Sequence, residues 1–443
     1  MFKTLVNALK VKDIRKRLLF TLFALIVVRI GCQIPAPGIN QSMVKSWLGE
    51  MDLGFFDALT GGSFTSMSIL ALNISPYINS SIIMQLMTIA IPKLAELQKD
   101  GESGRKKIAE ISRYLTVALS LIESSAMAIA FSRNGYTQDK KILTIIIIVL
   151  CFTAGSAFLM WLGENITEYG VGNGISIILT INIMAKLPSD FTNLYEVFIK
   201  GASKTVNAVL AAVIIIAVVL ATTILIILLQ DAIRKIPVQY SKKVVGRKMV
   251  GGNNSYIPLR VNTSGVIPVI FAISLMQFPI IISSFFGVQG KTGGSATIWE
   301  KILYTLNDDH WFNLESFSDF KYTLGALLYV LLIIFFAYFY TSVTFNPMEV
   351  SSNMKKSGGF IPGIRPGKPT TEYLTTILNR IVFIGAVMLI VVALIPIFFA
   401  GAFNASISFG GTSLIIIVGV VLETLKQIES MMVERHYKGF LNS

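Results

Sequence analysis

The chain has 443 residues, of which 53% are hydrophobic and only 14% are charged. Soluble domains carry about 25% charged residues, and disordered chains combine low hydrophobicity with high charge. The mean hydropathy of +0.68 excludes both classes and indicates a polytopic membrane protein. The formal charge of +13, from 38 basic against 25 acidic residues, is costly inside hydrocarbon and is therefore expected in the loops.

Ten apolar runs approach the ~20 residues that a helix needs to cross ~30 Å of hydrocarbon. The fifth run is short and ends near Pro188, which is typical of spans that lie against an internal cavity. The sequence therefore predicts an all-α polytopic membrane protein with spans near residues 18–34, 73–92, 114–132, 143–162, 174–188, 206–229, 264–286, 322–345, 374–396 and 407–425.

Basic residues are distributed unevenly between the two sets of loops. The two terminal segments and the loops after the second, sixth and eighth spans hold 26 of the 38 lysines and arginines, and the opposite side holds ten. Cytoplasmic loops carry such an excess, so both termini are predicted to be cytoplasmic. Five spans per half is an odd number. An N-terminal half (1–190) and a C-terminal half (191–443) are therefore expected to be inverted repeats around a central cavity.

Residues 57–72, between the first and second spans, are apolar but are interrupted by Gly61, Gly62 and several hydroxyls. As a helix this segment would reach only about 24 Å, too short to cross the bilayer. It is expected either to re-enter the space between the two halves, where protein or water surrounds it, or to lie as an amphipathic helix on the outer surface. The residues alone do not decide between these alternatives.

Motifs for catalysis and cofactor binding are missing from the sequence. It has neither the HExxH pattern of metalloproteases nor the GxSxG pattern of serine hydrolases, and it has two histidines. The segment Gly290-Lys-Thr292 resembles the end of a phosphate-binding loop, but Phe285 stands where the first glycine is required. We therefore expect no enzyme, no cofactor and no metal. A secondary transporter with an inverted repeat and an intramembrane enzyme are the rival hypotheses.

Few ionisable residues fall within the predicted spans, where they are functional candidates. Arg29 and Arg380 are close to span ends, and we interpret both as side chains that extend to the membrane surface. Glu123 lies in the middle of the third span. A lone carboxyl is typical of a local hydrogen-bonded cluster, for which the candidate partners are Asn79, Gln85 and Asn262.

Two large basic loops, at about 230–262 and 346–373, give the strongest functional signal from residue chemistry. Orientation of the chain and attraction to anionic lipids would account for their charge. However, rigid Pro and Gly residues surround a single arginine in Pro362-Gly-Ile-Arg-Pro-Gly367. That pattern favours projecting loops with a shaped surface for an RNA phosphate or an acidic protein patch.

Several long motifs, in the same order, resemble the SecY family, the channel subunits of the Sec protein translocon. The resemblance covers essentially the whole chain, and one departure is Met348, where some relatives have a basic residue. Its carriers are Ile74-Ser-Pro-Tyr-Ile-Asn-Ser-Ser-Ile-Ile-Met-Gln85, Trp161-Leu-Gly-Glu-Asn-Ile-Thr-Glu168, Gly172-Asn-Gly-Ile-Ser176, Val261-Asn-Thr-Ser-Gly-Val-Ile-Pro268, Phe345-Asn-Pro347, Lys355-Lys-Ser-Gly358, Pro362-Gly-Ile-Arg-Pro-Gly367 and Phe409-Gly-Gly-Thr-Ser413.

The resemblance implies ten helices in two inverted halves around a pore that conducts unfolded secretory proteins and releases transmembrane segments sideways. It implies a lateral gate between spans two and three on one side and seven and eight on the other. A re-entrant plug helix at 57–72 is expected beneath the pore ring. The implied residues are Ile74, Ile78, Ile175, Leu179, Ile270 and Ile416 for the ring; Phe64, Met67, Ile69 and Leu70 for the plug; and Asn79, Gln85, Glu123 and Asn262 for the gate.

The same resemblance implies a bacterial plasma-membrane location and a set of partners. These are the SecE and SecG subunits, the SecA motor, the ribosome, signal sequences, secretory polypeptides and membrane lipids, without DNA. SecA or the translating ribosome would supply the energy, so the channel itself is expected to be passive. The residues expected to dock SecA or the ribosome are Arg365, Lys355, Lys356, Arg247 and Lys248.

Overall fold

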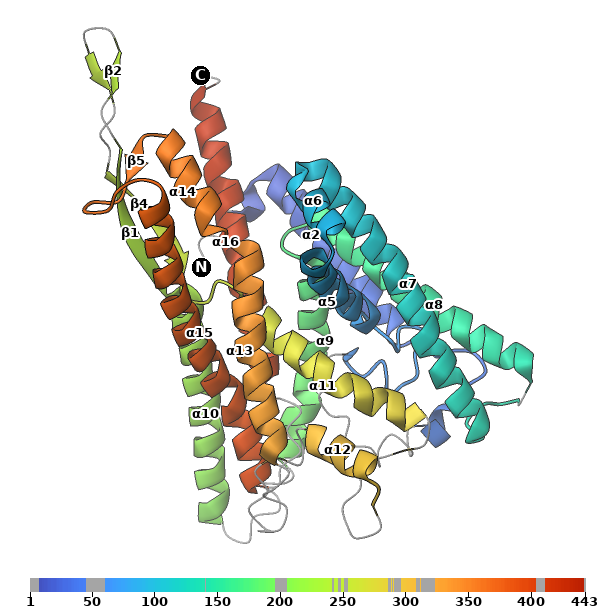
Figure 1. Ribbon diagram of the computed structural model, residues 1–443. Coiled ribbons are helices and arrows are strands. Elements are labelled where there is room, and N and C mark those ends of the chain that lie inside the picture. The colour runs from blue at the N-terminus through green and yellow to red at the C-terminus, as the bar shows by residue number, and fades with distance from the viewer. Residues whose placement is uncertain are drawn as a thin grey trace.

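The chain folds as a mostly helical bundle with a small β-sheet at one end (Figure 1). The computed structural model describes residues 8–44, 60–139, 141–195, 205–240, 243–245, 248–250, 254–285, 288, 290, 296–307, 311, 323–403 and 411–441.

The helices follow the apolar runs of the sequence. Those of the predicted N-terminal half are α2 (Lys12–Gly31), α5 (Ser75–Ala90), α6 (Pro92–Lys99), α7 (Gly101–Arg133), α8 (Ile142–Tyr169) and α9 (Gly174–Leu194). Those of the C-terminal half are α10 (Thr205–Asp231), α11 (Ile267–Phe285), α12 (Ile298–Leu306), α13 (Leu324–Thr344), α14 (Pro347–Lys356), α15 (Lys368–Phe403) and α16 (Gly411–Leu441).

Each of the ten predicted spans coincides with one of these helices. By length and composition, four helical segments in the described part of the chain can cross a membrane: Gly101–Arg133, Ile142–Tyr169, Leu324–Lys356 and Lys368–Ile395. A fifth arises if α5 and α6 form one span, although they meet at 105°. The chain is therefore a multi-pass membrane protein, and the full set of ten spans stays a prediction.

The bend between α5 and α6 has a local cause. Ile91 is extended, with φ −108° and ψ 111°, and Pro92 is the first residue of α6. Proline disfavours the helical conformation of the residue before it and cannot donate the helical hydrogen bond. The chain therefore turns sharply where α5 ends.

Residues 61–74 form consecutive turns and no α-helix, so the prediction of a plug helix is wrong for this part of the segment. Gly61 and Gly62 have φ +64° and +80°, and Met67 and Asn73 have φ 46° and 51°. These left-handed residues interrupt the right-handed helix, because its geometry requires negative φ throughout. Residues 57–59 lie outside the described part of the chain.

The two basic loops meet in one three-stranded sheet with the order β4-β1-β5, which the prediction of separate projecting loops missed. The long central strand pairs antiparallel with both neighbours. Its members are β1 (Ile233–Tyr240), β4 (Asn254–Arg260) and β5 (Gly359–Phe360). Two further strands, β2 (Lys243–Val245) and β3 (Lys248–Val250), form a hairpin beyond it.

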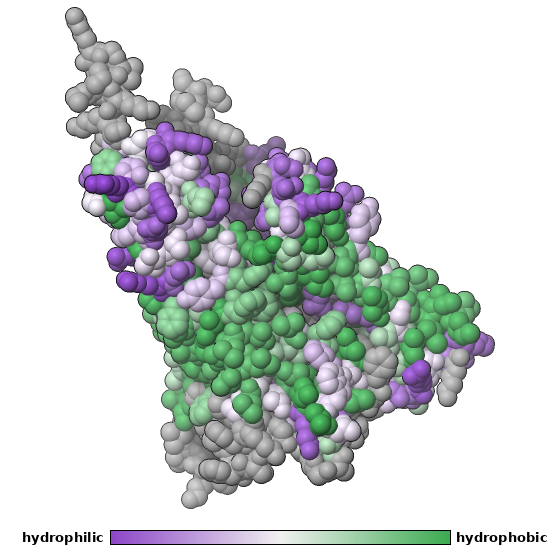
Figure 2. All heavy atoms as spheres, in the orientation of Figure 1, coloured by the Kyte–Doolittle hydropathy of each residue, from purple (hydrophilic) through white to green (hydrophobic). Residues whose placement is uncertain are grey.

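Surface chemistry divides the molecule into a polar end and an apolar band. Figure 2 shows polar side chains around the sheet and an apolar surface over α13 and the middle of α15. Single residues illustrate the band: Leu331, Phe335 and Ile384 are each at least half exposed. A helix that exposes such side chains is stable where lipid covers them.

Candidate functional site

The structure brings all six predicted ring residues into one hydrophobic cluster. Ile74, Ile78, Leu179 and Ile416 are at most 8% exposed, while Ile175 and Ile270 are partly buried against the same cluster. They come from the start of α5 and from α9, α11 and α16, so both predicted halves contribute. The six side chains are all branched aliphatics, which present no charge or hydrogen-bonding group, although the wider cluster also holds aromatic residues such as Trp311 and Tyr329.

The start of α9 is fixed by glycines and a capping asparagine. Asn173 accepts hydrogen bonds from the backbone N–H groups of Ile175 (3.1 Å) and Ser176 (3.3 Å). Gly174 lies so close to α8 that a Cβ there would be 1.9 Å from the Gly163 carbonyl oxygen. The Gly-Asn-Gly motif therefore allows α9 to begin in contact with α8, which positions Ile175 and, one turn later, Leu179.

The predicted plug residues are divided between two neighbouring hydrophobic clusters. Leu70 is 1% exposed and belongs to the ring's cluster, against which Ile69 also packs. Phe64 and Met67, 3% and 0% exposed, belong to a second cluster with residues of α7 and α8. The turn segment thus joins the ring to the interior of the N-terminal half.

Backbone hydrogen bonds hold the turn segment in place. The Met67 carbonyl accepts from Ala36 N–H, and Ile69 N–H donates to the Ile34 carbonyl, each at 2.9 Å. On the α8 side, a Cβ at Gly155 would lie 2.0 Å from the Ile69 carbonyl oxygen. The segment therefore fits a slot that only a glycine on α8 leaves open.

Arg29 binds this segment instead of extending to the membrane surface, so our interpretation of it as a surface-seeking side chain is wrong. Its Nη1 donates to the Gly61 carbonyl and to Asn182 Oδ1, both at 3.4 Å. Asn182 is fully buried on α9, and its Nδ2 has no hydrogen-bond partner among the described residues. Sequence reasoning missed this contact because no spacing pattern links residues 29, 61 and 182.

Two of the four predicted gate residues are in contact. Asn79 Nδ2 of α5 donates to Glu123 Oε1 of α7 at 3.3 Å. Gln85 instead donates to Ser81 of its own helix at 3.3 Å. Asn262 lies before α11, where its Oδ1 accepts from Ser264 at 3.5 Å, and its buried Nδ2 has no partner in the part of the chain that the structure describes. The structure therefore supports an Asn79–Glu123 pair and not a four-residue cluster.

The helices around that pair form two tightly joined sets. On one side, Ser80 Oγ of α5 donates to the Ser112 carbonyl of α7 at 2.8 Å. On the other, Phe271 of α11 meets Phe336 of α13 edge to face, with ring centroids 5.6 Å apart. Helix α11 also touches α7 and α5. The four helices expected to form the gate are therefore adjacent.

The predicted docking residues surround the sheet. Lys355 and Lys356 are exposed at the end of α14, and Arg365 is exposed in the following turn. The Arg365 carbonyl accepts from Thr370 Oγ1 at 2.8 Å, while Gly363 and Gly367 have φ +82° and +106°. This bond and the two glycines shape the turn, and within the described residues the guanidinium makes no hydrogen bond or ion pair.

The other basic loop, at about 230–262, contains the predicted docking residues Arg247 and Lys248. Arg247 lies outside the described residues, and Lys248 begins β3 with only its backbone described. Nearby, the Lys235 ammonium lies 4.9 Å from the Tyr256 ring centroid, a cation–π contact on an exposed part of the sheet. Within the described parts of the chain, no group of three His, Cys, Asp or Glu side chains could hold a metal ion.

The amino-acid sequence matches a known protein family over most of its length. The SecY family model matches residues 68–425. The protein translocase subunit SecY of Halalkalibacterium halodurans is 42% identical over 447 residues, covering 100% of both chains.

Two solved structures share the fold at low sequence identity. The first is a SecY protein whose plug domain stabilises the closed state of the translocation channel; its TM-score is 0.62 at 18% identity, over 95% of this chain and 92% of that one. The second is Sec61 in a canine ribosome-channel complex, with TM-score 0.58 and 17% identity over 95% and 93%. The family match over most of the chain and the full-length relative show that this chain belongs to the SecY family.

Proposed function

We propose that this chain is a protein-conducting channel that passes unfolded secretory polypeptides across the bacterial plasma membrane and releases transmembrane segments sideways into lipid. The observation that carries the proposal is that six uncharged aliphatic side chains from four helices of both halves belong to one hydrophobic cluster, to which Leu70 of the turn segment also belongs. The relatives at 42% identity and the structural neighbours are translocase subunits and channels.

In this proposal the ring is the constriction. An apolar ring excludes water and ions when closed. It also has no fixed charge with which to retain a passing chain, and its side chains can change rotamer around an extended polypeptide. Residues 57–72 act as the plug, because Leu70 packs with the ring residue Ile74 in one cluster. Opening requires Leu70 to leave and the ring to widen.

Lateral release would use the boundary between α5 and α7 on one side and α11 and α13 on the other. The Asn79–Glu123 pair stabilises the α5–α7 side. The ten helices would form two inverted halves, residues 1–190 and 191–443, that separate at this boundary. Such a movement resembles the rocking of repeats against one another in transporters.

Energy and docking would come from outside the chain. SecA or the translating ribosome would drive the polypeptide, and Arg365, Lys355 and Lys356, with Arg247 and Lys248, would dock either partner at the cytoplasmic face. The ribosome complex of the structural neighbour Sec61 supports this assignment. SecE and SecG would brace the two lipid-exposed halves. Both termini would be cytoplasmic, and no cofactor or metal would be needed.

Site-specific crosslinking of a stalled secretory precursor tests the pore. Cys32 and Cys151, the two native cysteines, are first replaced by alanine. Single cysteines are then introduced at Ile78 and Ile270, with Ile384, 54% exposed on the apolar band, as the control position. We expect precursor crosslinks at both ring positions and none at Ile384. Equal crosslinking at all three positions, or none at the ring, would contradict the proposal.

The same preparation separates the rival functions. If the chain were a secondary transporter, vesicles that contain it without a precursor would take up a small solute or ion in a saturable way. We expect no such uptake. The intramembrane-enzyme hypothesis predicts cleavage of the stalled precursor, which would appear as a shorter crosslinked product.

A further inference from the structure

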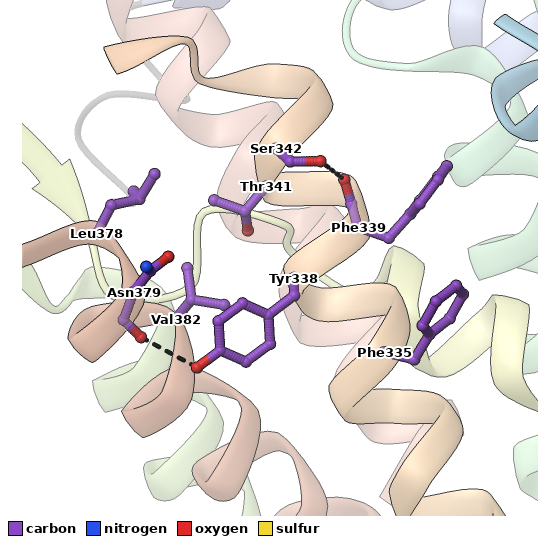
Figure 3. A pocket seen from close by; sticks show the side chains of 8 residues that line it. All are labelled: Phe335, Tyr338, Phe339, Thr341, Ser342, Leu378, Asn379 and Val382. Atoms are coloured by element: carbon purple, nitrogen blue, oxygen red, sulfur yellow. Dashed lines mark hydrogen bonds between the residues drawn. The ribbon is translucent and has the colours of Figure 1, made fainter. Parts of the chain in front are cut away.

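A pocket of about 510 Å³ opens between α13 and α15 (Figure 3). Phe335, Tyr338 and Phe339 line it from α13, and Leu378, Asn379 and Val382 line it from α15. The rings of Phe335 and Phe339 are stacked, with centroids 6.0 Å apart and an interplanar angle of 23°. The volume is in the range of small-molecule sites, and the walls are mainly apolar.

The hydroxyl groups in the pocket are already engaged by the protein backbone. Tyr338 donates to the Asn379 carbonyl at 3.2 Å, Thr341 to the Ala337 carbonyl at 2.7 Å, and Ser342 to the Phe339 carbonyl at 2.7 Å. The Asn379 side-chain amide has no hydrogen bond within the described residues and is exposed at the rim. The pocket therefore has an apolar interior with one free polar group at its edge.

The pocket lies where the polar surface changes to the apolar band. Along α15, exposed polar side chains continue to Asn379 and Arg380, and exposed apolar ones follow, with Phe383 52% and Ile384 54% exposed. On α13, Phe335 at the apolar end of the pocket is 55% exposed. Figure 2 shows the same change over these two helices. A ligand at this level meets both headgroups and hydrocarbon.

Arg380 supplies a charge at the same level. It is exposed, follows Asn379 directly, and has no ion pair or hydrogen bond within the described part of the chain. A guanidinium at a membrane boundary binds phosphate oxygens through charge-assisted hydrogen bonds. Arg380 does not line the pocket, but it is exposed one residue from the free amide of Asn379, so a phosphate at the rim has an amide and a guanidinium within one helical turn.

We propose that this pocket is a phospholipid site, with one acyl chain against Phe335, Phe339 and Val382 and the phosphate beside Asn379 and Arg380. The dimensions favour a lipid chain over the helix of a partner protein. The lining covers residues 335–342 of α13, about 10 Å of helix at ~1.5 Å per residue, and residues 378–382 of α15. A docked transmembrane helix would need a stripe of contacts several turns longer.

Photoactivatable lipids test the proposal on the full-length purified protein in vesicles. Phosphatidylglycerol and diglucosyl diacylglycerol, which has no phosphate, carry the same photoreactive acyl chain. Peptide mapping locates the labelled residues. We expect phosphatidylglycerol to label the pocket residues of α13 and α15. Substitution of Arg380→Gln should reduce this labelling while leaving the weaker labelling by the glycolipid unchanged.

Two variants that fill the pocket with a phenylalanine ring, and two matched controls outside it, test whether the lipid binds in the pocket. Val382→Phe fills it from the buried side, and Ser342→Phe fills it from the exposed rim, which keeps the test valid if the first variant does not fold. Ile384→Phe and Leu328→Phe add the same ring to exposed positions outside the pocket. We expect loss of pocket labelling only in the filling variants.

Three results would overturn the proposal. Pocket labelling that is insensitive to both filling variants would show that the lipid binds elsewhere. Equal labelling by the two lipids, with no effect of Arg380→Gln, would exclude phosphate recognition. A photoreactive residue can also be placed at Phe339 in native membranes. If it crosslinks to another polypeptide instead of to lipid, the pocket is a protein interface.

Discussion

The guanidinium of Arg29 donates a hydrogen bond to the Gly61 carbonyl and thereby ties helix α2 to the first turn of the proposed plug. The same nitrogen reaches Asn182 of α9, three residues beyond Leu179 of the ring. One side chain therefore connects the proposed plug to two helices of the N-terminal half, from which the plug would have to move when the channel opens. A partly buried charged group is costly to leave without hydrogen bonds, so these contacts should favour the closed arrangement.

Replacement of Arg29 by glutamine should loosen the plug. Loss of a hydrogen bond from a charged donor is worth about 1.5–3 kcal/mol, so the closed state should be less populated. We expect increased export of precursors with defective signal sequences, measured as the fraction of precursor processed in cells. Unchanged export at normal expression would show that the contact is not used in gating.

A pair of glycine variants separates the contacts of Gly61 with Arg29 and α9 from backbone strain. Gly61 and Gly62 both have positive φ, so alanine at either position costs about 1 kcal/mol of conformational strain. At Gly61, however, the new Cβ would lie 2.8 Å from Arg29 Nη1 and 2.9 Å from the Cα and carbonyl oxygen of Asn182, whereas at Gly62 the nearest atom is Thr65 Oγ1 at 3.9 Å. Gly61→Ala should mimic Arg29→Gln in the export assay, and Gly62→Ala should have the smaller effect.

The Asn79–Glu123 hydrogen bond can be tested by a double-mutant cycle. Asn79→Ala, Glu123→Ala and the double variant should give a coupling free energy of about 1 kcal/mol in unfolding measurements. Glu123→Leu should also relax the requirement for a hydrophobic signal sequence, because the α5–α7 side loses a polar contact. A coupling free energy of zero, together with an unchanged requirement for a hydrophobic signal sequence, would show that Glu123 contributes only to packing.

A polar residue in the ring should make the closed channel leak. We expect Ile78→Asn to raise chloride conductance in planar bilayers, because an amide hydrates a constriction that aliphatic side chains keep dry. Ile82, one turn further along α5 and 7% exposed in the same cluster, is outside the predicted ring. Ile82→Asn is therefore the matched control, and equal leakage from both variants would argue against the ring assignment.

Reversal of charge at Arg365 should impair SecA-driven translocation without loss of the folded chain. The turn geometry depends on the Arg365 carbonyl and on two glycines, which the substitution to glutamate leaves in place. The measurement is translocation of a precursor into vesicles with purified SecA, alongside the amount of inserted channel. Arg133→Glu, an exposed arginine at the far end of α7, is the control. Normal activity of Arg365→Glu would refute the docking assignment.

The positions of the helices were predictable from the sequence, because apolar runs of about twenty residues have few alternatives in a membrane. The six residues assigned to the ring from motifs fall in one large hydrophobic cluster, and their role as a ring stays a prediction. The plug conformation did not follow from the sequence. Its backbone depends on left-handed residues such as Met67. Methionine rarely adopts a positive φ, so nothing in the sequence indicated this conformation.

The sheet was missed for a different reason. Pairing of β1 with β5 joins residues more than a hundred positions apart, through only two residues of β5. The local signal was the alternation in Ile236-Pro-Val238, where both aliphatic residues are buried and Pro237 is exposed. Lysine and proline around this short pattern resemble a loop, and the burial that stabilises the strands comes from distant residues such as Met354 and Leu374.

The sheet also determines how a cytoplasmic partner could do mechanical work. Strand β1 follows α10 after one residue, β4 leads into the segment before α11, and β5 lies between α14 and α15. Antiparallel strands that share hydrogen bonds move together, so a load applied at Arg365 would be transmitted to three long helices at once. Through the sheet, a force applied at one docking point would act on several helices of the C-terminal half together.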